Sequence, residues 1–194
     1  MKLYGASGHG KMIIRILEDL NKKISKIYDD RAPFQILNYP VERYDGSENE
    51  NFIISVGNNK TRKAIVDKLK NVSYAVAIHP NAIIDKTVKI KDGTVVMPGA
   101  VINVDTRIGN HCIINTSASI DHECVLEDFV HISPNATLSG NVQVGEGAHI
   151  GAGAVVIPNV KIGKWATVGA GAVIIKDVPD GATVVGNPGR IIKQ

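Results

Sequence analysis

An aliphatic residue stands at every sixth position of this chain from residue 78 to residue 174, without an exception. The positions are Ile78, Ile84, Ile90, Val96, Ile102, Ile108, Ile114, Ile120, Leu126, Ile132, Leu138, Val144, Ile150, Val156, Ile162, Val168 and Ile174. Four residues after each of them stands Ala, Val, Thr or Cys. One large and one small apolar residue per six is typical of a short strand followed by a tight corner, and three such units close one coil. The repeat therefore predicts a parallel β-helix of hexapeptide repeats.

The composition fits a core built from this repeat. The chain has 26 Ile and 22 Val but only 7 Leu, and aromatic residues make up 5%. Of the 48 Ile and Val residues, 34 lie in residues 78–194. β-Branched residues favour strands, and a thin prism filled by one aliphatic column has no room for rings. We expect an α/β head at residues 1–77, an uninterrupted coil at 78–179 and a tail at 180–194.

Composition and charge also argue against several classes of protein. Charged residues at 21% beside 44% hydrophobic residues argue against global disorder. No apolar run approaches the ~18–20 residues that span a bilayer, and no secretory signal is visible, so we expect no membrane insertion and a cytoplasmic location. The net charge of +3 argues against a nucleic-acid binder. Cys112 and Cys124 occupy the small inward position of the repeat, so we expect buried core thiols rather than a disulfide or a metal pair.

The head alternates apolar strands with amphipathic helices, which is the pattern of a small Rossmann-like α/β unit. We expect strands at residues 2–6, 24–28, 52–56 and 73–78, and helices at about residues 10–22 and 60–70. The head carries 13 basic and 9 acidic residues, whereas the rest of the chain carries 9 and 10. Any preference for anionic ligands should therefore lie mainly in the head.

A glycine-rich turn joins the first expected strand to the first expected helix. It reads Gly-Ala-Ser-Gly-His-Gly at residues 5–10, and the next strand ends in Asp29 and Asp30. Backbone N–H groups at a helix N-terminus favour a phosphate, and an acidic strand end is where such folds hold a ribose or base. The spacing is not the dinucleotide fingerprint G-x-G-x-x-G. From the residues alone, the turn is either a nucleotide site or simply a tight turn, and the acidic pair is either a ligand contact or a solvated strand end.

Among six histidines, His122 has the environment of a general base. It stands between Asp121 and Glu123, and Asn115 precedes it by about one repeat. A neighbouring carboxylate can fix the tautomer of an imidazole and raise its basicity. His79 precedes a proline at the junction with the head and is expected to be structural. The residues at 111 and 149 lie at outward positions of the repeat, where solvated or interface roles are expected.

Four motifs together resemble a known family. They are the turn at residues 5–10, the segment Asn-Thr-Ser-Ala-Ser-Ile-Asp-His-Glu-Cys at 115–124, His131, and the end Gly-Asn-Pro-Gly-Arg at 186–190. They resemble the left-handed β-helix sugar acetyltransferases of bacterial glycan synthesis, especially the PglD-like branch. That branch acetylates the 4-amino group of UDP-4-amino-4,6-dideoxy-N-acetylglucosamine; the sialic acid O-acetyltransferases are also similar. Gly189 departs from the alanine that many relatives have in the tail motif.

The resemblance implies roles for particular residues. His122 would be the general base and Glu123 the residue that orients it, while Asn115 and His131 would line the same site, with His131 on the acetyl-CoA side. The other implied contacts are Ala152 and Ala170 for the coenzyme, and Ser7, Gly8, His9, Asp29 and Asp30 for the UDP-sugar. Acetyl-CoA would be a cosubstrate, with neither a metal nor a bound cofactor.

The spacing of the two site histidines predicts an assembly. His122 and His131 are nine residues apart, half of an 18-residue coil, so they lie on opposite sides of one prism. If both serve one site, they come from different subunits, and a ring of three prisms would form three equal sites. We therefore expect a homotrimer with direct acetyl transfer at the subunit interface.

Three other functions stay open on the sequence. A sialic acid or other sugar O-acetyltransferase would use the same fold and the same base. A metal-dependent enzyme like the γ-type carbonic anhydrases would need histidine ligands, but the spacings of 11, 9 and 18 residues between histidines 111, 122, 131 and 149 lack the close H-x-x-x-x-H pair of that family. A non-catalytic nucleotide-sugar-binding scaffold is the third.

Overall fold

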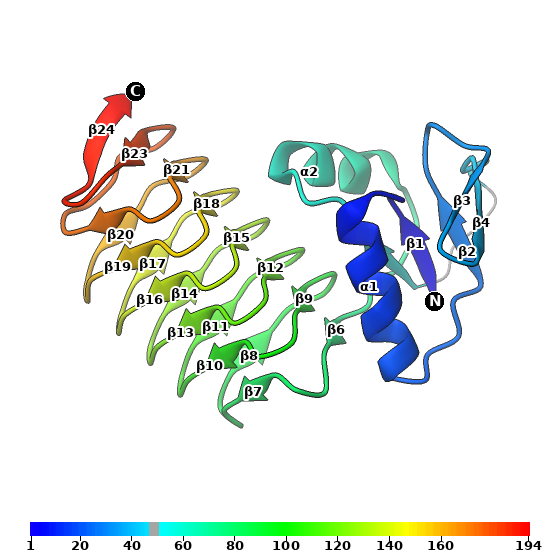
Figure 1. Ribbon diagram of the computed structural model, residues 1–194, viewed down its shortest axis with the longest axis horizontal. Coiled ribbons are helices and arrows are strands. Elements are labelled where there is room, and N and C mark those ends of the chain that lie inside the picture. The colour runs from blue at the N-terminus through cyan, green and yellow to red at the C-terminus, as the bar shows by residue number, and fades with distance from the viewer. Residues whose placement is uncertain (47–50) are drawn as a thin grey trace.

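The computed structural model describes residues 1–46 and 51–194, which form a head and an elongated coil lying side by side (Figure 1). In the head, a five-stranded sheet has the order β3-β4-β2-β1-β5, and only β3 and β4 pair antiparallel. The head elements are β1 (Lys2–Tyr4), α1 (Gly8–Asp19), β2 (Lys26–Tyr28), β3 (Phe34–Ile36), β4 (Tyr39–Glu42), β5 (Phe52–Ile54) and α2 (Asn59–Lys68). Helices follow β1 and β5, so the predicted Rossmann-like α/β arrangement is confirmed.

The head departs from the sequence expectation in three places. Helix α1 ends at Asp19 rather than near residue 22, because Asn21 adopts the left-handed conformation with φ of 52° and the Lys22 N–H donates to the Leu17 carbonyl. The sequence does not predict the β3–β4 hairpin, whose strands of three and four residues are too short for a clear apolar alternation. The strand expected at 73–78 splits into a single bridge at Tyr74 and the first strand of the coil.

The coil is a three-sided parallel β-helix whose strands stack every 18 residues. Its faces are sheet I (β6, β9, β12, β15, β18, β21, β23, β24), sheet II (β7, β10, β13, β16, β19, β22) and sheet III (β8, β11, β14, β17, β20). The chain passes from sheet I to II to III and back, so each coil has a I/II, a II/III and a III/I corner. Pairing between successive coils is parallel and in register, as between His131 and His149. The predicted hexapeptide-repeat fold is confirmed.

The strands of the coil are short. Their bounds are β6 (Ala77–Ile78), β7 (Ile83–Ile84), β8 (Lys89–Ile90), β9 (Val95–Val96), β10 (Val101–Ile102), β11 (Arg107–Ile108), β12 (Ile113–Ile114), β13 (Ser119–Ile120), β14 (Val125–Leu126), β15 (His131–Ile132), β16 (Thr137–Leu138), β17 (Gln143–Val144), β18 (His149–Ile150), β19 (Val155–Val156), β20 (Lys161–Ile162), β21 (Thr167–Val168), β22 (Val173–Ile174), β23 (Thr183–Val185) and β24 (Arg190–Lys193). The second residue of each two-residue strand is the aliphatic residue of the repeat, and the first points outward.

The aliphatic column and its small companions fill the coil. From Val96 to Ile174 every member of the column is at most 2% exposed, while the three members before it are partly buried at the open end. Cys112 and Cys124 are fully buried free thiols in the same cluster. Burial raises the pKa of Cys112 to about 12 and that of Cys124 to about 11. Both are core residues, as expected, and neither offers a reactive thiolate at neutral pH.

The head is fixed to the coil by apolar and polar contacts. Outward residues of β6, β9 and β12 belong to the same hydrophobic cluster as α1, so the head covers the lower strands of sheet I. At the III/I corner, the Arg62 guanidinium is 1% exposed and donates to the carbonyls of His111 and Phe129 at 2.8 Å each. It also donates to Val56 and Gly57 carbonyls at 3.1 Å. This one side chain joins helix α2, the loop after β5 and two successive coils.

Candidate active site

The II/III corner between β13 and β14 holds a histidine in contact with a carboxylate. His122 Nδ1 lies 3.0 Å from Glu123 Oε2, and both side chains are more than half exposed. Asp121 fixes the turn, because its Oδ1 accepts the His122 N–H at 2.8 Å and the Asn103 amide at 3.1 Å. A carboxylate at Nδ1 holds the ring in the tautomer whose Nε2 is free to accept a proton. This is the arrangement that a general base requires.

Gly140, one coil above His122, makes room for the imidazole. A Cβ atom at residue 140 would lie 2.5 Å from both Cε1 and Nε2 of His122, closer than real Cβ contacts come. Gly140 is not among the glycines with positive φ, so the turn itself does not require a glycine there. The glycine therefore serves the position of the ring. The sequence analysis missed Gly140; the signal that finds it is its offset of one coil from His122.

Asn115 and His131 form a second polar group, on the I/II corner and the adjacent strand of sheet I. Asn115 Nδ2 lies 3.1 Å from His131 Nε2. Since Asn115 Oδ1 accepts the Thr116 N–H at 2.8 Å, the amide nitrogen is the donor and His131 Nε2 accepts. Burial, with smaller contributions from His149 and Arg62, lowers the pKa of His131 to about 3. His131 is therefore a neutral residue at every working pH.

His149 extends this group upward. Its ring stacks on that of His131 with centroids 4.8 Å apart and planes 12° apart, and its Nε2 lies 2.7 Å from Ser133 Oγ. Burial, together with the charge of Arg62, lowers the pKa of His149 as well. The sequence predicts a solvated or interface role for His149, but its ring is held in the same row as a candidate site residue.

Within one chain, the two groups lie on different corners. Asn115 precedes β13 and His122 follows it, so sheet II separates them. His131 lies on sheet I, across the prism from the II/III corner, as its nine-residue spacing from His122 predicts. The structure therefore brings Asn115 to His131 and Glu123 to His122, and it does not join the two pairs within the chain.

The head carries a cavity of about 300 Å³ at the ends of β1 and β2. Its lining consists of Tyr4, Gly5, Ser7, Asp29, Asp30, Arg31, Val56, Thr61 and Ile65. Asp29 accepts the Ala6 N–H at 2.9 Å and two bonds from the Arg31 guanidinium, and its bonds to Arg31 above all lower its pKa to about 2. Asp30 accepts the Tyr4 hydroxyl at 2.7 Å and pairs with Lys68 at 3.3 Å.

Two of the five predicted sugar-nucleotide residues lie outside that lining. Gly8 is the first residue of α1, and no atom lies within 4 Å of where its Cβ would be. His9 lies beside Gly57 with its Nε2 buried and unpartnered among the described residues, and burial lowers its pKa to about 4. Three predicted residues thus share one cavity, and the other two lie at the helix start next to it.

A second cavity, of about 410 Å³, separates the head from sheet I. The loop at residues 57–60 lines one side, and His131, Gly147, His149, Trp165 and Thr167 line the other. Above the Asn115 level, the I/II corner carries Ala152 and Ala170, both exposed, with the Gly171 N–H donating to the Ala152 carbonyl at 2.8 Å. Small exposed residues leave this corner open along its length.

Comparisons with known proteins identify the class of enzyme. Residues 1–69 match the model of the PglD N-terminal domain, and residues 141–176 match the model of the bacterial transferase hexapeptide repeat. A solved perosamine N-acetyltransferase from Caulobacter crescentus, in complex with CoA and GDP-perosamine, is 34% identical over 100% of this chain and 96% of that chain, with a TM-score of 0.95. The chain belongs to the hexapeptide-repeat sugar N-acetyltransferase family.

Two other solved structures agree with this assignment to the sugar N-acetyltransferases. The acetyltransferase domain of PglB from Neisseria gonorrhoeae FA1090 is 36% identical over 98% of both chains, with a TM-score of 0.93. WeeI from Acinetobacter baumannii AYE is 30% identical over 98% of both chains, with a TM-score of 0.90. No curated protein matches the sequence. The chain is therefore an acyltransferase with the left-handed β-helix of its family.

Two negative findings concern this acyltransferase over residues 1–46 and 51–194. No helix in these ranges is both long and apolar enough to cross a membrane. In the same ranges, no three His, Cys, Asp or Glu side chains of one chain gather where they could hold a metal ion.

Proposed function

We propose that this sugar N-acetyltransferase transfers the acetyl group of acetyl-CoA to the 4-amino group of a UDP-linked 4-amino-4,6-dideoxy sugar. His122 is the general base, and the transfer is direct, at the interface between subunits of a homotrimer. One observation carries the proposal: each chain has two complementary half-sites, His122 with Glu123 and Asn115 with His131, on the two edges of a single uncharged sheet.

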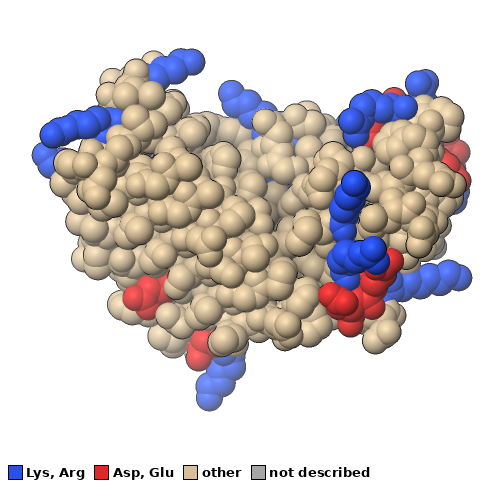
Figure 2. Space-filling view, in the orientation of Figure 1, with Lys and Arg blue, Asp and Glu red and all other residues tan. Residues whose placement is uncertain are grey.

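Sheet II supports the trimer. The outward residues of its six strands are Ile83, Val101, Ser119, Thr137, Val155 and Val173, and none is charged. Ile83 is 67% exposed and Val155 is 36% exposed in the single chain. In the orientation of Figure 2, the coil presents a broad face with few charged side chains, and the charges gather over the head and at the ends of the coil. An apolar face of this kind marks an interface.

A three-fold axis in front of sheet II and parallel to the coil joins the half-sites. Rotation about that axis brings the I/II corner of each chain to the II/III corner of its neighbour, and the ring closes after three copies. Asn115 and His122 are seven residues apart, which at ~4.8 Å per 18-residue coil is a height difference of about 2 Å. The two groups therefore meet at the same level of adjacent prisms.

The chemistry follows from the free Nε2 of His122. The sugar amine attacks the thioester carbonyl, so that a C–N bond forms and the C–S bond breaks. His122 takes the proton from the attacking nitrogen and delivers it to the departing sulfur, which leaves as the thiol of CoA. Glu123 stabilises the imidazolium that exists between these two transfers.

The neutral Asn115–His131 pair supplies an uncharged wall opposite this base. Because burial holds the pKa of His131 at about 3, His131 carries no proton charge that would repel an imidazolium across the interface. The exposed backbone at Ala152 and Ala170 continues the same edge upward and would contact the coenzyme. Ser7, Asp29 and Asp30 in the head cavity would hold the nucleotide, with Gly8 and His9 at the start of α1 beside it.

Thiol release from acetyl-CoA tests the proposal. The panel consists of UDP-, GDP- and dTDP-linked 4-amino-4,6-dideoxy sugars, with free sialic acid as the O-acetyl acceptor. We expect turnover with the UDP-linked amine and a loss of about 10²–10⁴ in kcat for His122→Ala. Preference for another base would reassign the nucleotide only, turnover with sialic acid alone would move the enzyme to the O-acetylating relatives, and binding without turnover would favour a scaffold.

A further inference from the structure

Three unpaired cations gather at the lower end of sheet III, away from the residues discussed so far. Arg107 on β11 is directly opposite Lys89 on β8, and Lys91 follows β8. All three side chains are exposed, and within the described part of the chain none has an ion pair or a side-chain hydrogen bond. Like charges directly opposite one another on neighbouring strands destabilise a sheet. A bound anion would reverse that cost.

The cations line the largest cavity of the described chain, about 460 Å³ in volume. The acidic residues that share this cavity are engaged elsewhere. Asp128 accepts the Asn110 N–H at 2.7 Å, Glu127 accepts the Glu146 N–H at 2.9 Å, and Glu146 pairs with Lys63 at 3.5 Å. The positive charge of Lys89, Lys91 and Arg107 is therefore not neutralised within the chain.

The head cavity, by contrast, has no spare cation. Its two carboxylates and its two nearest cations form pairs, Arg31 with Asp29 at 2.8 Å and Lys68 with Asp30 at 3.3 Å. A nucleoside diphosphate sugar brings two phosphate groups to this electrically balanced site. Its negative charge needs a partner from outside the head.

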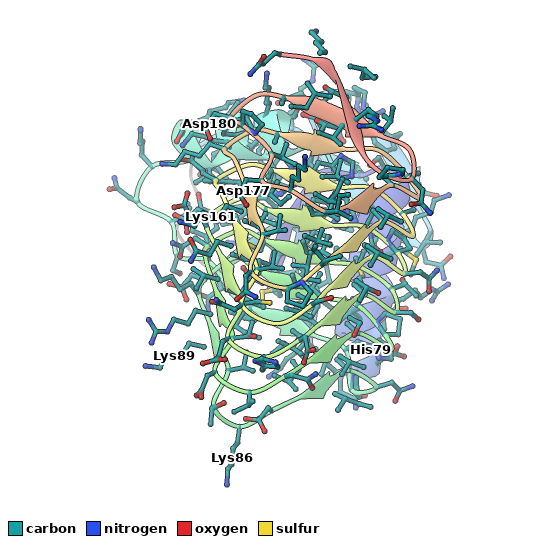
Figure 3. The ribbon with its side chains drawn as sticks, turned by 90° about the vertical axis from the view of Figure 1, so that its left-hand side faces the viewer. His79, Lys86, Lys89, Lys161, Asp177 and Asp180 are labelled. Carbon is teal, nitrogen blue, oxygen red and sulfur yellow. The ribbon has the colours of Figure 1, made fainter. Side chains whose placement is uncertain are left out.

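The proposed trimer supplies that partner. With sheet II toward the axis, sheet III of one chain faces sheet I and the head of its neighbour across the outer cleft. The head covers β6, β9 and β12, the lower strands of sheet I, and β8 and β11 are the lower strands of sheet III. Figure 3 shows Lys89 projecting from the same side of the coil as Lys161, which lies four strands higher on sheet III.

The heights fit a sugar that bridges the two charges. Arg107 precedes His122 by 15 residues and Lys89 precedes it by 33, which corresponds to about 4 Å and 9 Å below it along the coil. The 4-amino group and the C1 diphosphate lie at opposite ends of a pyranose ring. A sugar with its amine at His122 therefore directs its diphosphate down the cleft, toward the head and these cations.

We propose that Lys89 and Arg107 of one subunit, with Lys91 beside them, bind the diphosphate of the nucleotide sugar held by the head of the neighbouring subunit. This inference rests on the proposed function, because it requires the trimer and a sugar nucleotide acceptor. It assigns a phosphate-binding role to a surface of sheet III, and it makes acceptor affinity depend on two subunits.

The test is the steady-state kinetics of Lys89→Ala, Arg107→Gln and the double variant. A charge-assisted hydrogen bond to phosphate is worth about tenfold in affinity, so we expect KM for the nucleotide sugar to rise about tenfold in each single variant. The KM for acetyl-CoA and kcat should stay within twofold. Raising ionic strength should weaken acceptor binding less in the double variant than in the wild type.

Lys161→Ala is the matched control, since it removes an exposed lysine of the same sheet at a different height. We expect its KM for the nucleotide sugar to be that of the wild type. A double variant whose KM values are both unchanged would overturn the inference, and so would one that raises only the KM for acetyl-CoA, since the phosphates bound would then be those of the coenzyme. A wild-type enzyme without turnover of any nucleotide sugar would instead refute the proposed function, so the two failures are distinguishable.

Discussion

Replacing Gly140 by alanine tests whether the imidazole position sets the rate. The new Cβ would lie 2.5 Å from His122 Cε1 and Nε2, whereas ordinary contacts begin at 3.4 Å, so the ring has to move by about 0.9 Å. A misplacement of about 1 Å at a reacting group costs roughly 10²-fold in rate. We therefore expect kcat for thiol release to fall about 10²-fold in Gly140→Ala. Thermal unfolding should change little, because this glycine does not have a positive φ.

A double-mutant cycle separates this effect from general damage to the coil. If Gly140→Ala acts through the imidazole, it should cost almost nothing in a His122→Ala background, because the group that it displaces is already absent. An unchanged kcat in the single variant would refute the steric argument. A 10²-fold loss that persists without His122 would show that Gly140 acts by another route.

Three further predictions follow from the contacts around the site. Glu123→Gln should lower kcat about tenfold, since the imidazolium loses a charged hydrogen-bond partner; a rate equal to the wild type would refute the orienting role. Arg62→Met should lower the free energy of unfolding in urea by at least about 3 kcal/mol, because the carbonyls that Arg62 bonds on the loop after β5 and on two coils lose their donor. Burial lowers the pKa of His111 to about 4, so its unfolded form takes up a proton first as the pH falls below about 6.5, and stability decreases from there toward pH 4. His111→Phe should therefore flatten the dependence of Tm on pH in that range, and an unchanged slope would assign the acid sensitivity to other groups.

The fold of the coil was predictable because its repeat is one-dimensional. Each aliphatic residue from Val96 to Ile174 occupies the interior position that the six-residue period assigns to it, and Cys112 and Cys124 fill the small position. The period also places His122 and His131 on opposite sides, since nine residues are half a coil. Local spacing is enough in a fold whose contacts all repeat at one offset.

The details that the sequence analysis missed arise from contacts between distant segments. Nothing local marks Arg62 as buried, because its partners are carbonyls 49 and 67 residues away on two coils. The stack of His149 on His131 and the space over Gly140 both come from the 18-residue offset, which shows only once strand register is known. The β3–β4 hairpin lies in the head, where no repeat fixes the register.

The most direct test of a site shared between subunits is complementation in mixed trimers. His122→Ala lacks the II/III half-site, and Asn115→Ala with His131→Ala lacks the I/II half-site, so each variant alone should be nearly inactive. After equal amounts are unfolded together and refolded, about one quarter of the interfaces should pair an intact half-site from each chain. We predict thiol release at about one quarter of the wild-type rate. If the mixture stays as inactive as its components, both half-sites act within one chain and the interfacial site is wrong.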